Sequence, residues 1–272
     1  MAADGRLEML GEQSTHGCNP VHLALTASAQ WLLVANYASG NVASIAVSAL
    51  GDLGAVAHVL TLPGASGPHA QQDGSHPHQI CFTPDGRYAM VPDKGLDKVF
   101  ALTVDERTGR LDIANTLTMV PGSGPRHMVF HPTLSLAYIV GELDRTVVTV
   151  QHDQTSGRLH ATAVQSTVPA GHAHGSAAGI VLSLDSHRLF VSNRGHDSVA
   201  MFDVGSAGGL DTATWLTAGK TPRFITLNPQ DGQLLVARED GHSIAVHQGT
   251  DTFHELVQTG SPVCIVFKKE TP

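Results

Sequence analysis

The sequence predicts an all-β protein, a β-propeller built from four-stranded antiparallel blades. Five pairs of positions, each marking the opening of one strand and the close of the next, are separated by the same 16 residues. They are Pro20 and Asn36, Pro77 and Asp93, Pro125 and Gly141, Ala177 and Asn193, and Pro222 and Arg238. A fixed offset with variable side chains marks a repeat. Repeats of about 40 to 50 residues without a long helical apolar stripe are typical of propeller blades.

Each full repeat is expected to hold four short strands. In the second repeat these are residues 79–83, 88–92, 98–104 and 110–117. Pro84-Asp85-Gly86-Arg87 supplies a turn between the first two, because proline and glycine favour turn geometry. Third strands show apolar alternation of period two, as in residues 147–150 and 198–202.

The ends of the chain resemble parts of a repeat. Residues 1–272 are expected to form one propeller domain, with five full repeats in residues 18–260. Asp4-Gly5-Arg6-Leu7 resembles Thr108-Gly109-Arg110-Leu111, so residues 1–17 are predicted to supply the outer strand of an incomplete blade. Residues 261–267 repeat only a first strand, so residues 261–272 are predicted to supply the inner strand of a closing blade. The ring would close through a composite sixth blade, stay open, or be closed by a second chain, and unpaired blade edges favour a homo-oligomer.

The composition describes a globular chain that can bury a large core. Of its 272 residues, 42% are hydrophobic and 15% are charged. The formal net charge of -8 argues against a general nucleic-acid binder. Cys18, Cys81 and Cys264 form no spaced pair, and no apolar run is long enough to cross a bilayer. We therefore expect a cytoplasmic protein without membrane or nucleic-acid partners.

Two columns of side chains are expected to meet at one mouth of the propeller channel, because the first strand of a blade descends and the second returns. One column follows the opening residue and contains Val21, His78, Arg126, Ala178, Arg223 and Val263. The other follows the second strand and contains Tyr37, Lys94, Glu142, Arg194 and Glu239. Basic and imidazole groups outnumber acids here, which predicts an anionic small-molecule ligand held by arginine. The structural alternative is that ion pairs such as Glu142 with Arg126 fill the channel.

The residue types indicate the chemistry. Arg126 and Arg194 are suited to bind an anion or to stabilise a developing oxyanion. His78 is the best candidate for a general base, and the alternative is a hydrogen-bonded structural histidine. Glu142 is suited to orient an arginine, or to position or deprotonate a water. Weaker candidates are His22, His69, His76 and His127. The pairs His76-Pro77-His78 and His172-Ala173-His174 lack partners at ligand spacing, so no metal is expected.

Several motifs resemble one known family. They include Val34-Ala35-Asn36-Tyr37, Pro77-His78, Gly124-Pro125-Arg126-His127, Glu142-Leu143-Asp144, Val191-Ser192-Asn193-Arg194-Gly195-His196-Asp197-Ser198-Val199, Lys220-Thr221-Pro222-Arg223 and Ser261-Pro262-Val263-Cys264. With these motifs the chain resembles the lactonase family of seven-bladed β-propellers, which includes propeller-type 6-phosphogluconolactonases and the fungal carboxy-cis,cis-muconate cyclase.

The resemblance implies hydrolysis of 6-phospho-glucono-1,5-lactone in the pentose phosphate pathway of glucose metabolism, without a cofactor. It assigns the catalytic histidine, arginines and glutamate to His78, Arg126, Arg194 and Glu142. His78 or Glu142 would assist proton removal from water, and an arginine would stabilise the oxyanion. The expected substrate-binding residues are His22, Lys94, His127, Lys220 and Arg223, with Arg223 and Lys220 suited to the phosphate.

The chain also departs from the family pattern. It lacks most of two N-terminal repeats, Gly141 replaces an asparagine, and Gly179 stands where a glutamate is common. Two other functions therefore stay open besides the hydrolase: a muconate-type lactonising cycloisomerase, which the same arginines would serve, and a non-catalytic binding propeller that has lost blades.

Overall fold

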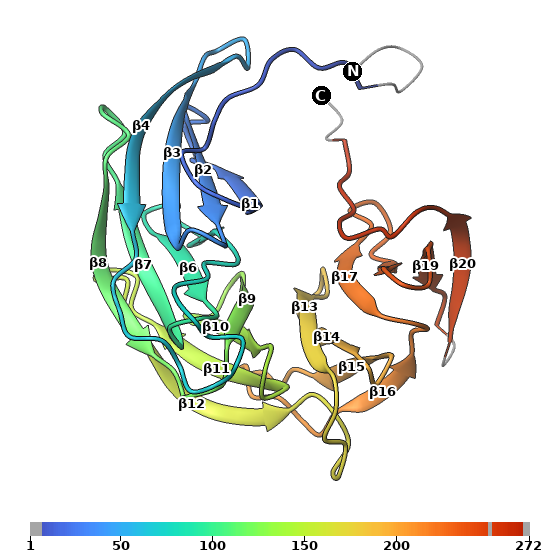
Figure 1. The fold of residues 1–272 in the computed structure, drawn as a ribbon. Helices are drawn as coiled ribbons and strands as arrows, with labels where there is room; N and C mark the ends of the chain where they lie inside the picture. Colours follow the sequence, from blue (N-terminus) through green and yellow to red (C-terminus); the bar gives the residue numbers. More distant parts are fainter. Residues whose placement is uncertain (1–6, 250–251, 269–272) are drawn as a thin grey trace. The chain divides into compact units, whose positions relative to one another are not determined.

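The structure, a computed structural model, describes residues 7–249 and 252–268. Within these residues the fold is all-β, with twenty strands in five four-stranded antiparallel sheets, the blades of a propeller (Figure 1). The chain divides into two compact units, Met1–Thr118 and Met119–Pro272. Each unit is described by itself below. No helix in the described ranges is long and apolar enough to cross a membrane.

The N-terminal unit contains two blades. The strands of the first are β1 (Pro20–Leu25), β2 (Trp31–Asn36), β3 (Asn41–Val47) and β4 (Leu53–Thr61). Those of the second are β5 (Cys81–Phe82), β6 (Ala89–Asp93), β7 (Lys98–Val104) and β8 (Leu111–Thr118). The four strands expected in the second repeat are all present. The first of them is shorter than expected, and the third has the expected bounds.

The C-terminal unit contains three blades. The strands of the third blade are β9 (Pro125–Phe130), β10 (Leu136–Gly141), β11 (Thr146–His152) and β12 (Leu159–Ser166). The fourth blade has β13 (Ser176–Leu182), β14 (Arg188–Arg194), β15 (Ser198–Asp203) and β16 (Thr214–Thr217). The fifth has β17 (Pro222–Leu227), β18 (Leu234–Arg238), β19 (Ser243–His247) and β20 (Phe253–Gln258).

The core of each unit lies between neighbouring blades. Leu33 and Val42 of the first blade pack with Phe100 and Leu111 of the second. In the C-terminal unit, one cluster joins the third and fourth blades and another joins the fourth and fifth. Burying one such side chain contributes roughly 1.5–3 kcal/mol. The second and third strands of the blades are therefore largely buried, whereas β1 is largely exposed.

The constant offset of 16 residues is the pairing register of the first two strands in each blade. Pro20, Pro125, Ala177 and Pro222 lie opposite Asn36, Gly141, Asn193 and Arg238, and Pro77 forms an isolated bridge with Asp93. A spacing read from the sequence thus corresponds to one pair of opposed residues that recurs in five blades.

The two ends of the chain differ from the prediction within the described residues. Residues 7–17 form no strand, and residues 1–6 lie outside the description. Residues 261–268 also form no strand, and residues 269–272 lie outside it. A strand requires a partner for its N–H and C=O groups, and resemblance to a strand sequence does not supply one. Near the N-terminus, the Thr15 hydroxyl instead donates a hydrogen bond to Asn36 Oδ1 at 2.8 Å.

Candidate functional site

A β-bulge lies directly after the opening residue of each blade. One extra residue stands in the first strand at Val21, Arg126 and Arg223. In the fourth blade Ala178 and Gly179 together face Ser192, and in the second blade residues 78–80 face residues 91–92. A bulge turns a side chain out of the regular alternation of a strand. The first predicted column is therefore the series of residues at these bulges.

Backbone hydrogen bonds bring the second column beside the first. The N–H of Glu142 donates to the carbonyl of Gly124 at 2.8 Å, and that of Glu239 donates to Thr221 at 2.9 Å. The same contact joins Tyr37 to Asn19 at 3.0 Å and Lys94 to His76 at 3.0 Å. Four blades thus hold the residue that follows the second strand next to their own bulge, and in the fourth blade Arg194 is the register partner of Ser176.

In the C-terminal unit, Glu142 joins two arginines. Its Oε2 lies 2.8 Å from Arg126 Nε, and its Oε1 lies 3.1 Å from Arg194 Nη2. Only 4% of the Arg126 side chain and 7% of the Glu142 side chain are exposed, compared with 16% for Arg194. Arg194 is therefore the member of this Arg126–Glu142–Arg194 cluster that solvent or a ligand reaches most readily.

The fourth blade makes room for the cluster because its bulge carries small residues. Arg126 Nη1 donates to the carbonyl of Ala178 at 2.9 Å, and Arg194 Nη2 donates to that of Ala177 at 3.0 Å. At the next position, a Cβ atom added to Gly179 would lie 2.9 Å from Ile225 Cγ1 and 3.0 Å from the Ile225 backbone nitrogen. A larger residue at this position would therefore require Ile225 of the fifth blade to shift.

Burial and charge act on Arg126 in opposite directions. Desolvation lowers the pKa of Arg126 to about 10, with a further decrease from the positive charges of Arg194 and Arg223, while Glu142 raises it. The guanidinium therefore stays charged at neutral pH. The cluster of two arginines and one glutamate keeps one net positive charge, which suits an anionic ligand or a developing oxyanion.

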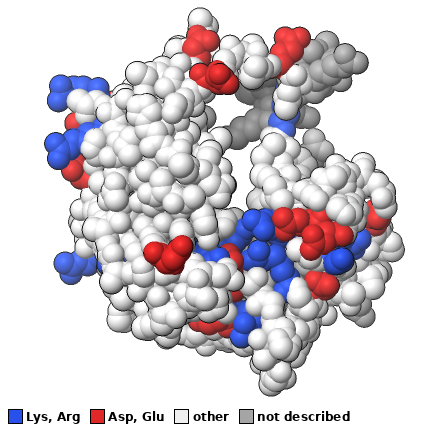
Figure 2. All heavy atoms as spheres, in the orientation of Figure 1, with Lys and Arg blue, Asp and Glu red and all other residues white. Residues whose placement is uncertain are grey.

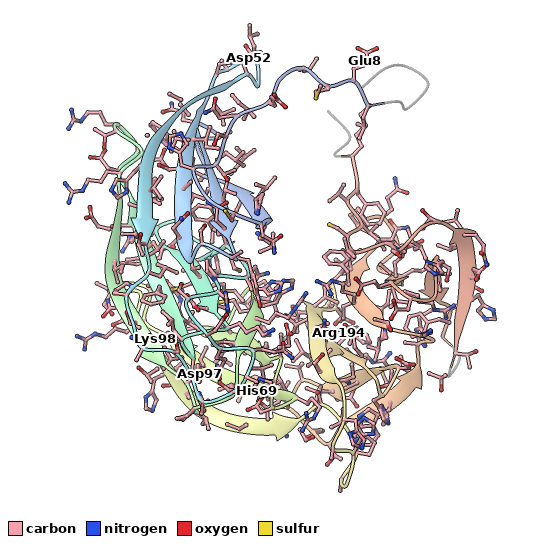
Figure 3. All side chains as sticks on the ribbon, in the orientation of Figure 1. Glu8, Asp52, His69, Asp97, Lys98 and Arg194 are labelled. Carbon is pink, nitrogen blue, oxygen red and sulfur yellow. The ribbon has the colours of Figure 1, made fainter. Side chains whose placement is uncertain are left out.

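The fifth blade carries a second arginine–glutamate pair. Arg223 Nη1 lies 3.2 Å from Glu239 Oε2, and 33% and 27% of the two side chains are exposed. Basic and acidic side chains gather side by side over the region of β13 and β17 (Figure 2). Lys220 is exposed and lines a different hollow of about 310 Å³, together with His196 and Trp215. In Figure 3 the labelled Arg194 lies beside β13.

In the N-terminal unit, the corresponding positions hold aromatic and basic groups. Tyr37 stacks on the His76 ring at a centroid distance of 4.4 Å, and its edge contacts His78 at 5.5 Å. Lys94 Nζ lies 5.8 Å from the Tyr37 ring centroid and donates to Gln71 Oε1 at 2.7 Å. His78 and Lys94 are both buried. This second group, Tyr37, His76, His78 and Lys94, is held by ring contacts, by the hydrogen bond from Lys94 to Gln71, and by a contact of 2.7 Å between His76 Nε2 and Asp73 Oδ1.

The other predicted residues have mainly local contacts. His22 Nδ1 accepts a hydrogen bond from Ile80 N at 3.3 Å, which joins the first two blades. His127 Nε2 lies 3.3 Å from Arg126 Nη1. His69 is exposed on the loop before β5 and accepts from Gln71 N through Nδ1 (Figure 3). Among the described residues, no group of three His, Cys, Asp or Glu side chains is arranged to hold a metal ion.

The structure therefore places Arg126, Glu142 and Arg194 in one cluster, with His127 beside it and Arg223 close enough to affect the pKa of Arg126. His78, Lys94 and His22 belong to the other unit. Sequence reasoning did not select Tyr37, Gln71 or Glu239 as site residues. Tyr37 and Glu239 were nevertheless visible as members of the second column.

Comparison with known proteins gives consistent results. A family model described as "Lactonase, 7-bladed beta-propeller" matches residues 1–267. The 6-phosphogluconolactonase of Bacillus subtilis (strain 168) is 31% identical over 274 residues, covering 97% of this chain and 77% of that protein.

Solved structures share the fold at similar levels of identity. A protein of Bacteroides fragilis NCTC 9343 is 27% identical with a TM-score of 0.85, over 96% of this chain and 76% of that one. The periplasmic gluconolactonase of Pseudomonas aeruginosa is 31% identical with a TM-score of 0.80, over 91% of this chain and 72% of that one.

Proposed function

This chain belongs to the lactonase family of seven-bladed β-propellers, and from that premise we propose that it hydrolyses a sugar lactone, with 6-phospho-glucono-1,5-lactone as substrate. The observation that carries the proposal is the cationic Arg126–Glu142–Arg194 cluster at the strand ends of two neighbouring blades. Relatives named 6-phosphogluconolactonase and gluconolactonase support the substrate class. The reaction would belong to the pentose phosphate pathway in the cytoplasm.

Burial suggests different roles for the two arginines. Arg126 donates to the Ala178 carbonyl and contacts Glu142 from a buried position. Arg194 is more exposed and shares the same carboxylate. We assign Arg194 to the lactone carbonyl oxygen, where it stabilises the oxyanion. We assign Arg126 to hold the cluster in place. A single well-placed oxyanion donor contributes about 10²–10³-fold to the rate.

The proton transfer is assigned to His78. Both carboxylate oxygens of Glu142 already contact an arginine, so Glu142 is assigned the role of counter-ion. A neutral imidazole is the better base near neutral pH. His78 enters the proposal from the column pattern of the sequence and from the family resemblance.

The chemical steps are those of ester hydrolysis. The oxygen of water attacks the lactone carbonyl carbon while His78 accepts one of its protons. The carbonyl π electrons move to the oxygen, next to Arg194. When the oxyanion collapses, the bond between the carbonyl carbon and the ring oxygen breaks. The ring oxygen takes up the proton that His78 accepted, which returns His78 to its neutral form. The product is an open-chain sugar acid.

A coupled assay tests the proposal. Freshly generated 6-phosphogluconolactone is supplied, 6-phosphogluconate formation is followed through its dehydrogenase, and the spontaneous rate is subtracted. We expect Arg194→Met to lower kcat/KM about 10²–10³-fold. Arg188→Met is the matched control, because Arg188 opens the same strand and forms a surface ion pair with Asp203 at 3.7 Å. A folded wild-type protein with no rate above the spontaneous one would contradict the proposal for this substrate.

A further inference from the structure

The fifth blade repeats the arginine–glutamate pair of the third blade at the same positions of the repeat. Arg126 and Arg223 are both bulge residues, and Glu142 and Glu239 both follow the second strand. Each pair is 16 residues apart and is joined by an ion pair, of 2.8 Å in the third blade and 3.2 Å in the fifth. The backbone therefore presents the same two side chains twice in one unit.

The two pairs differ in what else holds the arginine. Arg126 is buried, donates to a backbone carbonyl and shares its glutamate with a second arginine. Within the described part of the chain, the Arg223 guanidinium donates one hydrogen bond, which goes to Glu239. A guanidinium carries five N–H donors, so most of those on Arg223 remain available to a ligand. The exposure of both partners lets a ligand approach without unfolding the blade.

The position of Arg223 also suits an anion. Its charge contributes to the lowered pKa of Arg126, so it lies within electrostatic range of the cluster. Arg126, Arg194 and Arg223 are accompanied by Glu142 and Glu239, which leaves an excess of one positive charge while the fifth-blade pair is intact. If Glu239 were displaced from Arg223, the planar guanidinium of this arginine would offer its N–H donors to an anion.

On the basis of the proposed function, we propose that Arg223 and Glu239 determine specificity for a phosphorylated substrate. The phosphate takes the place of Glu239 on Arg223. A phosphate monoester carries about -1.5 to -2 charges at pH 7 and offers three acceptor oxygens, whereas a carboxylate carries one charge and two oxygens. Glu239 thus acts as an exchangeable counter-ion that a phosphate displaces more readily than a singly charged group does.

Binding of the two possible products tests this inference. Isothermal titration calorimetry measures the Kd of 6-phosphogluconate and of gluconate for the full chain. We expect wild type to prefer 6-phosphogluconate. We expect Arg223→Gln to reduce that preference about 10–100-fold, the range of one charge-assisted hydrogen bond. Glu239→Gln should tighten gluconate more than 6-phosphogluconate, because the competing carboxylate has been removed.

The controls separate this inference from the proposed reaction. Arg188→Gln, which alters a surface ion pair outside the cluster, should leave both Kd values unchanged. Circular dichroism and thermal melting establish that each variant is folded. An unchanged preference in Arg223→Gln, or equal affinity of wild type for both ligands, would overturn the inference even if the lactonase assay succeeds. A preference that depends on Arg223 would support it even if that assay fails, because binding is measured without turnover.

Discussion

The predicted column residues of the N-terminal unit and those of the C-terminal unit use one backbone arrangement for two kinds of chemistry. In the second blade the bulge and the following loop carry His78 and Lys94, beside the stacked rings of Tyr37 and His76. In the third blade the equivalent positions carry Arg126 and Glu142 as an ion pair. The pairing register and the bulge decide where a side chain is presented. The side chain alone decides whether that position supplies a base, a cation or a counter-ion.

The largest expected effect tests whether the N-terminal unit contributes the base. His78→Asn should lower kcat/KM about 10²–10⁴-fold, the usual contribution of a positioned general base. Asparagine keeps a polar group of similar size but accepts no proton near neutral pH. The coupled lactone assay measures the change, and His187→Asn, at an exposed turn, serves as the control. Equal rates for wild type and His78→Asn would remove His78 from the mechanism.

A stability measurement sharpens the contrast between buried and exposed pairs. Glu142→Gln leaves Arg126 and Arg194 without their shared counter-charge. Removing one partner of a buried pair typically costs about 3–5 kcal/mol. Glu239→Gln, at the same repeat position in the exposed pair, should cost only about 0–1 kcal/mol. Urea unfolding followed by circular dichroism compares the two variants. Similar losses in both would mean that burial does not distinguish the two pairs.

Sequence reasoning recovered the strands and the columns because both follow from the chain's own spacing. The offset between Pro125 and Gly141 is the pairing register of β9 and β10, so the repeat in the sequence predicts it. The Arg126–Glu142 ion pair, the structural alternative for these residues, is present because both belong to one blade. Whether the cluster also performs the chemistry predicted for it is the question that the assays address.

What the sequence did not reveal depends on contacts between repeats or on whether a strand finds a partner among the described residues. Arg194 reaches Glu142 from a neighbouring blade, and Arg126 reaches across to the carbonyl of Ala178. Such contacts depend on the packing between blades, which a repeat pattern does not contain. The pattern of residues 261–267 indicated a strand for the opposite reason: it encodes strand propensity but not the neighbour that a ladder requires.

The smallest expected effect concerns Asp93, the residue before Lys94. Burial raises the pKa of Asp93 above its ordinary value of 3.8, although hydrogen bonds from the Ser75 hydroxyl and from the N–H groups of His76, Leu96 and Gly95 oppose the shift. A carboxyl with a raised pKa in the folded state contributes stability that is fully present below pH 3.8. That contribution is lost as the pH rises through the folded-state pKa.

Asp93→Asn removes this titration, so its urea midpoint should fall less than that of wild type as the pH rises from about 4 to 7. The slope is the measured quantity, because the asparagine also loses hydrogen bonds and so shifts the whole curve. Asp144, three residues after the equivalent position Gly141 in the third blade, is a second test, since burial raises its pKa as well. Asp144→Asn should flatten the curve in the same direction. Parallel curves for wild type and Asp93→Asn would mean that Asp93 titrates alike in the folded and unfolded chain, and that its buried position at the end of β6 does not penalise the charge.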